Sequence, residues 1–172
     1  MGLFSRFSSK RSTANEPQVD ASVLAIVAPA TGNVVTLEST SDPAFSGRAM
    51  GDGVAIVPTE GTIVAPVSGT VGAIFPTGHA FAVATDDGAT QVMVHIGIDT
   101  VQLNGTGFTA HVAQGERVSA GQPVVTIDLK KIADAGFDPT TFVVVCERPS
   151  GTSLREHETG PVSAGDELLW LS

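Results

Sequence analysis

The segment IVAPATGNV, residues 26–34, recurs as IVAPVSGTV at residues 63–71. In each copy an apolar run stops at a proline, passes through a Thr or Ser and a Gly, and resumes as a second apolar run. Proline pre-sets the backbone for a turn and glycine tolerates conformations that other residues avoid, so each copy predicts a strand, a turn and a second strand. A repeat with this order and spacing indicates an internally duplicated domain.

A second repeated segment extends the duplication towards the C-terminus. The segment VSAG occurs at residues 118–121 and again at 162–165, and an apolar run follows each copy after a short polar step. The chain has 19 Gly and 10 Pro in 172 residues and few aromatic residues, which favours short strands over long helices. We therefore predict an all-β protein: an antiparallel β-sandwich or flattened barrel of a duplicated motif, with very short helices near residues 42–50 and 128–135.

Residues 1–20 differ in composition from the rest of the chain. They are rich in Ser, Thr, Asn, Lys and Arg. We predict a flexible N-terminal tail over residues 1–20 and one folded domain over residues 21–172. The few apolar residues of the tail lie at one-sided helical spacing beside basic ones, which would allow weak association with an anionic membrane surface; plain disorder is the alternative.

Charge and cysteine content limit the partners and the compartment. The net charge of −9 disfavours nucleic acid and suits a basic protein partner, although solubility alone would also explain it. A single cysteine, Cys146, can form neither an intrachain disulfide nor a thiolate metal cluster. With no secretory signal and no run of membrane-spanning length, we expect a cytoplasmic protein.

Two histidines flank the hairpin sequence at residues 76–95. A three-residue loop at 86–88, with its glycine in the left-handed conformation, would pair Thr85 with Ala89 and set His79 opposite His95. Directly opposed residues have Cβ atoms about 5 Å apart, so both imidazoles could reach one small group, whereas a slip of one residue would separate them. Neutral imidazole is nucleophilic near pH 7, which suits reversible phosphoryl transfer.

Parts of these motifs also occur in proteins with two other chemistries. The spacing of His95 and Asp99 occurs in zinc peptidases of related duplicated folds, but His111 and His157 stand alone, so His79 and His95 could bind zinc only with a residue from a partner. We expect no intrinsic metal. Carrier domains bearing biotin or a lipoyl group need a lysine at a hairpin tip, and none stands at these corners, so we expect no cofactor.

Together these motifs resemble the enzyme IIA component of the glucose class of the bacterial phosphoenolpyruvate-dependent sugar phosphotransferase system. The resemblance covers nearly the whole body. It rests on the segments IVAP at 26–29, GDGVAI at 51–56, VAPVSG at 64–69, PTGHA at 76–80, VHIGIDTV at 94–101 and GTGF at 105–108.

The resemblance implies a phosphoryl carrier that serves sugar transport as a phosphotransferase component. It implies acceptance of phosphate from the histidine-containing phosphocarrier protein HPr and donation to the IIB domain of a IIB/IIC sugar permease. His95 would be phosphorylated at Nε2 while the Gly97 carbonyl holds its Nδ1–H, His79 would stabilise the phosphoryl group, and Thr77 would support His79. Asp99 would lie near the site.

An apolar docking surface around the histidines is also implied, with Phe45 and Phe75 as its anchors. The matching positions are Pro43, Ala44, Phe45, Met50, Phe75, Met93 and Val101. One residue beyond the family pattern between Gly88 and His95 predicts a bulge near Ala89 or Thr90. Regulatory protein targets are compatible with such a surface, and the transported sugar is not encoded in it.

Overall fold

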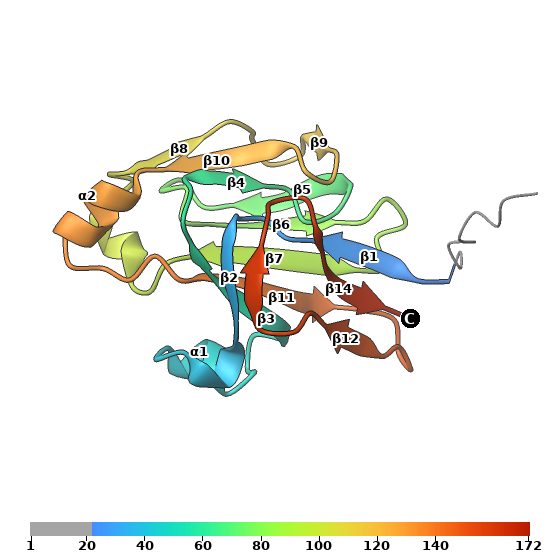
Figure 1. The fold of residues 1–172 in the computed structure, drawn as a ribbon. Helices are drawn as coiled ribbons and strands as arrows, with labels where there is room; N and C mark the ends of the chain where they lie inside the picture. Colours follow the sequence, from blue (N-terminus) through green and yellow to red (C-terminus); the bar gives the residue numbers. More distant parts are fainter. Residues whose placement is uncertain (1–21) are drawn as a thin grey trace, which may run out of the picture.

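The computed structural model describes residues 22–172 (Figure 1). The predicted tail and its membrane association lie outside the described residues. The strands are β1 (Leu24–Val27), β2 (Gly32–Thr36), β3 (Asp52–Pro58), β4 (Thr62–Val64), β5 (Gly69–Ile74), β6 (Ala80–Ala84), β7 (Gln91–Ile96), β8 (Phe108–Ala110), β9 (Arg117–Val118), β10 (Pro123–Ile127), β11 (Thr141–Glu147), β12 (Leu154–Glu156), β13 (Gly160–Val162) and β14 (Glu167–Leu171). The short helices are η1 (Leu37–Ser39), α1 (Pro43–Ser46), η2 (Thr100–Leu103) and α2 (Leu129–Asp134).

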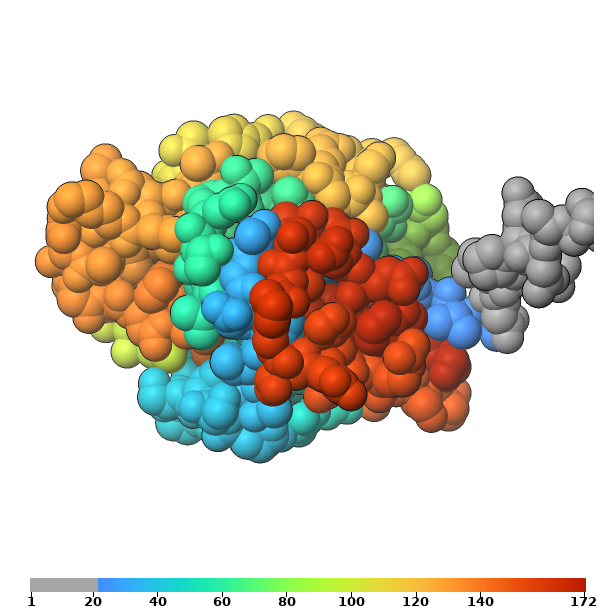
Figure 2. Space-filling view, viewed as in Figure 1, coloured from blue at the N-terminus to red at the C-terminus, as the bar shows by residue number. Residues whose placement is uncertain are grey.

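Three antiparallel sheets enclose one main core. The large sheet has the strand order β13-β2-β3-β11-β7-β6-β5-β9, and the smaller sheets are β1-β14-β12 and β4-β10-β8. Buried side chains from all three sheets, such as Ile26, Ile63 and Phe81, belong to the same apolar cluster. The space-filling view shows the C-terminal segment next to the N-terminal one on this face (Figure 2), in keeping with the pairing of β14 with β1 and of β13 with β2. The predicted all-β sandwich is confirmed.

The internal duplication appears in the hydrogen bonds of the two proline corners. The Val27 N–H donates to the Pro66 carbonyl, and the Val64 N–H donates to the Pro29 carbonyl, both at 2.8 Å. The VSAG glycines repeat the relation, because Gly165 donates to the carbonyl of Ala28 at 2.9 Å and Gly121 to that of Ala65 at 2.9 Å. The two copies thus form equivalent bonds, as the repeats predict.

Both predicted helices form, and each begins at an aspartate. The Asp42 carboxylate accepts from the Ala44 N–H at the start of α1, where Pro43 takes the first position. The Asp128 carboxylate accepts from the Lys131 N–H at the start of α2. Aspartate and proline are favoured there because the first helical N–H groups need acceptors. Within residues 22–172, no helix has the length and apolar character needed to cross a bilayer.

A small second core lies on the outer face of the large sheet. Because side chains alternate along β11, Val143 joins the main core while Phe142 and Val144 point to the other face. There they pack with Leu37 of η1 and Phe45 of α1. The α1 segment therefore covers the sheet face to which Phe142 points.

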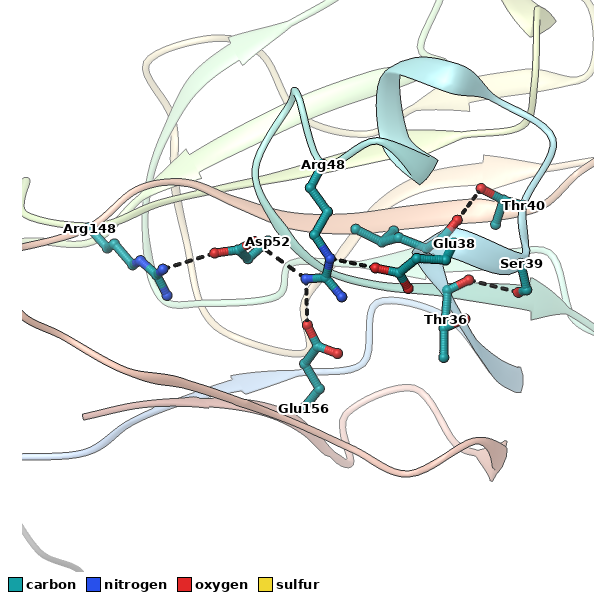
Figure 3. Close-up of polar contacts among 9 residues, drawn as sticks. Thr36, Glu38, Ser39, Thr40, Arg48, Asp52, Arg148 and Glu156 are labelled. Carbon is teal, nitrogen blue, oxygen red and sulfur yellow. Dashed lines mark hydrogen bonds and ion pairs between the residues drawn. The ribbon is translucent and has the colours of Figure 1, made fainter.

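Arg48, just after α1, ties this segment to the sheet (Figure 3). Its guanidinium pairs with Glu38 at 2.6 Å, with Glu156 of β12 at 3.0 Å and with Asp52 of β3 at 3.4 Å, and Asp52 also pairs with Arg148 at 2.8 Å. Partly exposed ion pairs each contribute only about 0.2–1 kcal/mol, so the network orients α1 more than it stabilises the fold.

The hairpin register differs by one residue from the prediction. Ala80, and not His79, lies opposite His95, because Thr85 pairs with Thr90 across a four-residue loop. The Thr85 hydroxyl accepts from the Thr90 N–H, which closes the longer loop, while Gly88 takes the expected left-handed conformation with φ +68°. The propensity rule for short hairpins could not anticipate this side-chain contact.

The predicted bulge near Ala89 or Thr90 is also wrong. The ladder from Ala80–His95 to Ala84–Gln91 is continuous, and Ala89 is accommodated in the loop, where its N–H donates to the Asp87 carboxylate. The irregularity of β7 instead lies on its other side, where β11 skips a residue between Val145 and Glu147.

Candidate functional site

The structure brings the rings of His79 and His95 together despite the shifted register. Their centroids are 5.3 Å apart and the ring planes are inclined by 81°. His95 is in β7, whereas His79 precedes the first residue of β6 and follows Gly78, whose φ is +73°. Because His79 lies outside the regular strand, the alternation of side chains does not fix its direction. The inference of a paired site therefore holds for a different reason from the one predicted.

His79 is held by Thr77. The Thr77 hydroxyl lies 2.5 Å from Nδ1 of His79, and the His79 carbonyl accepts from the Ile96 N–H at 2.7 Å. His79 is 4% exposed. With Nδ1 occupied by Thr77, Nε2 of His79 is the nitrogen left for a group bound between the rings.

Aromatic rings flank both imidazoles. Phe75 lies 5.0 Å from His79, and Phe45 lies 5.2 Å from His95 (centroid distances). Phe45 also stacks on Phe142, with centroids 4.0 Å apart. The prediction that Phe45 is an exposed docking anchor is wrong, because this ring is 4% exposed and belongs to the outer-face core.

The remaining predicted docking residues are accessible to different degrees. Phe75 is 52% exposed, and Met50 and Val101 are also exposed. Met93, between Ala82 and Val144 in the sheet, is half-buried. An exposed apolar side chain therefore lies directly against the His79 ring.

Burial lowers the pKa of both histidines below the ordinary value of 6.5. Desolvation is the larger cause for each, and the neighbouring His95 further lowers the pKa of His79. The Gly97 peptide and the carboxylates of Asp42 and Asp99 oppose the shift at His95. Both imidazoles are therefore neutral at pH 7, the state in which a ring nitrogen can act as a nucleophile.

These shifts predict a pH dependence of stability. The folded state binds fewer protons than the unfolded state once the pH falls below about 6.5, so the free energy of unfolding should decrease as the pH falls through that range. Chemical denaturation at pH 7.5 and 5.5 measures the loss. The double variant His79→Gln/His95→Gln should lose less over this interval than the parent. An equal loss in both proteins would contradict the prediction.

The Gly97 carbonyl was expected to accept a hydrogen bond from Nδ1 of His95. Nδ1 is buried and forms no hydrogen bond within residues 22–172, although the Gly97 peptide acts on the ring by raising its pKa. Gly97 itself adopts φ +82°, and a Cβ at this position would collide with the side chain of Thr100. The site therefore needs glycine here for both reasons.

Sequence reasoning missed Asp42, which acts electrostatically on His95 together with the expected Asp99. The sequence indicates Asp42 as the start of a helix. However, only the strand order β3-β11-β7 places that helix, α1, over β7. Asp99 takes a left-handed conformation with φ +58° at the start of η2. In residues 22–172, no group of three or more His, Cys, Asp or Glu side chains is arranged to hold a metal ion.

The sequence matches a known family over most of its length. The model of the phosphoenolpyruvate-dependent sugar phosphotransferase system EIIA 1 family matches residues 24–150. The chain belongs to this family. Membership confirms the resemblance seen in the sequence.

Three relatives illustrate the similarity. The chain is 49% identical over 135 residues to the glucose-specific EIICBA component of Streptococcus pneumoniae, covering 78% of this chain and 18% of that protein. It is 42% identical over 130 residues to the glucose-specific EIIA component of Bacillus cereus, covering 76% and 78%. The solved glucose permease IIA of Mycoplasma capricolum superposes with a TM-score of 0.80 at 37% identity, covering 86% and 95%.

The length of the relatives varies. The chain spans about a fifth of the EIICBA protein and of the beta-glucoside-specific EIIBCA component of Halalkalibacterium halodurans, which is 45% identical over 147 residues. It matches most of the Bacillus cereus protein. Sequence similar to this chain therefore occurs in relatives of very different length.

Proposed function

We propose that this protein carries a phosphoryl group on His95, accepting it from HPr and donating it to the IIB domain of a glucose-type sugar permease. The observation that carries the proposal is the pair of imidazoles of His79 and His95, whose ring centroids are 5.3 Å apart, beside the exposed Phe75 in an EIIA-family fold. The transfer would couple sugar uptake to sugar phosphorylation.

In the proposed step, Nε2 of neutral His95 attacks the phosphorus of phosphorylated HPr. A nitrogen–phosphorus bond forms at His95 as the bond to the donor imidazole breaks, and the donor nitrogen leaves with the electron pair. His79, oriented by Thr77 at 2.5 Å, donates a hydrogen bond to the phosphoryl oxygens. Such positioning matters because the transition state is loose and its charge lies mainly on those oxygens.

Transfer to the permease would reverse these roles. The attacking nucleophile then belongs to IIB, and the His95 nitrogen becomes the leaving group. Both partners would use the exposed apolar side chains of Met50, Phe75 and Val101, with Met93 at the edge. A few desolvated apolar anchors supply most of the binding energy of such transient complexes.

Phe75→Asp is expected to weaken exchange with both partners. Burying a carboxylate in place of an anchor costs about 2 kcal/mol or more, which corresponds to roughly a 30-fold loss of affinity. Because Phe75 is 52% exposed, circular dichroism should be unchanged. The transfer rate from phosphorylated HPr measures the effect, and Phe75→Leu is the matched control. Parental rates in Phe75→Asp would place the docking surface elsewhere.

The carrier unit is proposed to be residues 21–172, with residues 1–20 dispensable for phosphate acceptance in the cytoplasm. Deleting residues 1–18 should leave the acceptance rate within about twofold of the parent, because the site is built from the body. Any loss should appear only with membrane-bound permease. A folded truncation that no longer accepts phosphate from HPr would contradict this assignment.

Other partners remain secondary to this proposal. Regulatory proteins could use the same apolar side chains, and a zinc ion could join His79 and His95 only if a partner supplied another ligand.

The proposal that His95 carries a phosphoryl group is tested by intact mass after incubation with phosphoenolpyruvate, the general phosphotransferase enzyme and HPr. A gain of one acid-labile phosphoryl group supports it, and no gain would indicate a non-catalytic binding module.

A further inference from the structure

Hydrogen bonds fix both peptide planes that meet at Gly97, two residues after His95. The Gly97 N–H donates to the Thr140 carbonyl at 2.9 Å, and the Ile98 N–H donates to the Asp138 carbonyl at 2.9 Å. The Thr100 hydroxyl donates to the Ile96 carbonyl. Each of the two planes is thus anchored through at least one of its polar groups.

This anchoring determines where the Gly97 carbonyl points. In a trans peptide the carbonyl and the following N–H point in opposite directions, so the bond from the Ile98 N–H to Asp138 turns the Gly97 carbonyl away from Asp138. Gly97 lies two residues after His95, and its peptide opposes the fall in the pKa of that ring. Nδ1 of His95 is a buried nitrogen that has no hydrogen-bond partner within residues 22–172.

Two side chains, Thr100 and Asp138, set up these anchors. Thr100 is completely buried, and its hydroxyl satisfies the Ile96 carbonyl while its methyl group fills the space beside Gly97. The Asp138 carboxylate accepts from the N–H of Thr140 at 2.8 Å and from its hydroxyl at 2.6 Å. Asp138 thereby shapes the turn whose carbonyls hold Gly97 and Ile98.

We propose that Thr100 and Asp138 are positioning residues that hold the Gly97 carbonyl in place to accept the Nδ1–H of His95. The inference rests on the proposed function of His95. A neutral imidazole carries one proton, so an acceptor for Nδ1–H leaves Nε2 with a free electron pair. This brace, formed by Thr100 and Asp138, therefore selects the tautomer of His95 that can attack phosphorus. Without it the proton would be shared between the two nitrogens, and part of the protein would present a protonated Nε2.

The chain offers a matched pair of variants at each position. Thr100→Val keeps the shape but removes the hydroxyl, and Thr100→Ser restores the hydroxyl. Asp138→Ala removes the acceptor, and Asp138→Asn restores one through its amide oxygen. Asp138 lies at the surface, so its variants remain informative even if the buried Thr100→Val does not fold.

The test uses the full chain labelled with ¹⁵N, before any phosphorylation. Long-range proton–nitrogen spectra report which nitrogen of His95 carries the proton. The parent should show the Nδ1–H tautomer, and Thr100→Val and Asp138→Ala should show a several-fold increase in the Nε2–H form. Phosphate acceptance from HPr should fall about 3- to 10-fold in parallel. Thr100→Ser and Asp138→Asn should restore both readings.

Two outcomes would overturn the proposal. One is a folded Thr100→Val or Asp138→Ala protein with the parental tautomer and the parental rate. The other is a slower rate with an unchanged tautomer, which would reduce both residues to general stabilisers of the loop. Failure of the parent to accept phosphate would instead refute the proposed function, and the tautomer comparison would still decide whether the brace exists.

Discussion

His95→Gln is expected to take up no phosphate from phosphorylated HPr. The substitution removes the nitrogen that forms the bond to phosphorus. The neighbouring His79 should not replace it, because in the proposed step its Nδ1 faces the Thr77 hydroxyl and its Nε2 keeps the proton that it donates to the phosphoryl oxygens. Glutamine is polar and of similar size, so the fold over Phe45 and Phe142 should persist. Intact mass after the phosphorylation reaction measures the result.

His111→Gln provides the matched control for this variant. His111 is exposed and contacts the Thr126 hydroxyl of β10, which belongs to a different sheet from His95, so its loss should leave phosphate uptake at the parental level. If the His95→Gln protein still gained a phosphoryl group, another residue would have to be the nucleophile.

His79→Gln is expected to accept phosphate but to pass it on slowly. His79 contributes hydrogen bonding and placement rather than the covalent bond, and loss of one positioned donor from a transition state costs on the order of a hundredfold in rate. Rapid mixing with a IIB domain measures the second transfer. The two variants should therefore differ in effect although the ring centroids of His79 and His95 are only 5.3 Å apart.

The location of the phosphoryl group checks the same assignment. Phosphopeptide mapping of the parent should place it on the peptide with His95. If the group were found on His79, the two roles would have to be exchanged. Thr77→Val should resemble a mild form of His79→Gln, since it frees the ring that Thr77 holds.

Much of the fold could be predicted because local sequence patterns determine many of its turns and strands. The two proline corners gave β1 with β2 and β4 with β5, and the VSAG segments precede β10 and β14. Turn residues and capping aspartates act over a few positions, so their consequences can be derived from the sequence. The pairing of strands distant in the chain could not be derived in this way.

The site was predicted less completely, for physical reasons that its residues show. The hairpin register depended on the Thr85 hydroxyl, a single contact that length rules ignore. Phe45 looked like a surface anchor, but its burial follows from Phe142 on β11, almost one hundred positions away. Asp42 and Thr100 act on His95 or its loop through tertiary contacts that one sequence without structure does not reveal.

The pairing of β1 with β14 has a consequence for how the chain is made. Leu24 pairs with Leu171 and Val27 with Glu167, so the ribosome must add well over one hundred residues before β1 meets its partner. At the usual rate of synthesis this wait is on the order of ten seconds. During it the edge of β1 and the apolar residues beneath it lack their cover, which makes the nascent chain a natural client for chaperones.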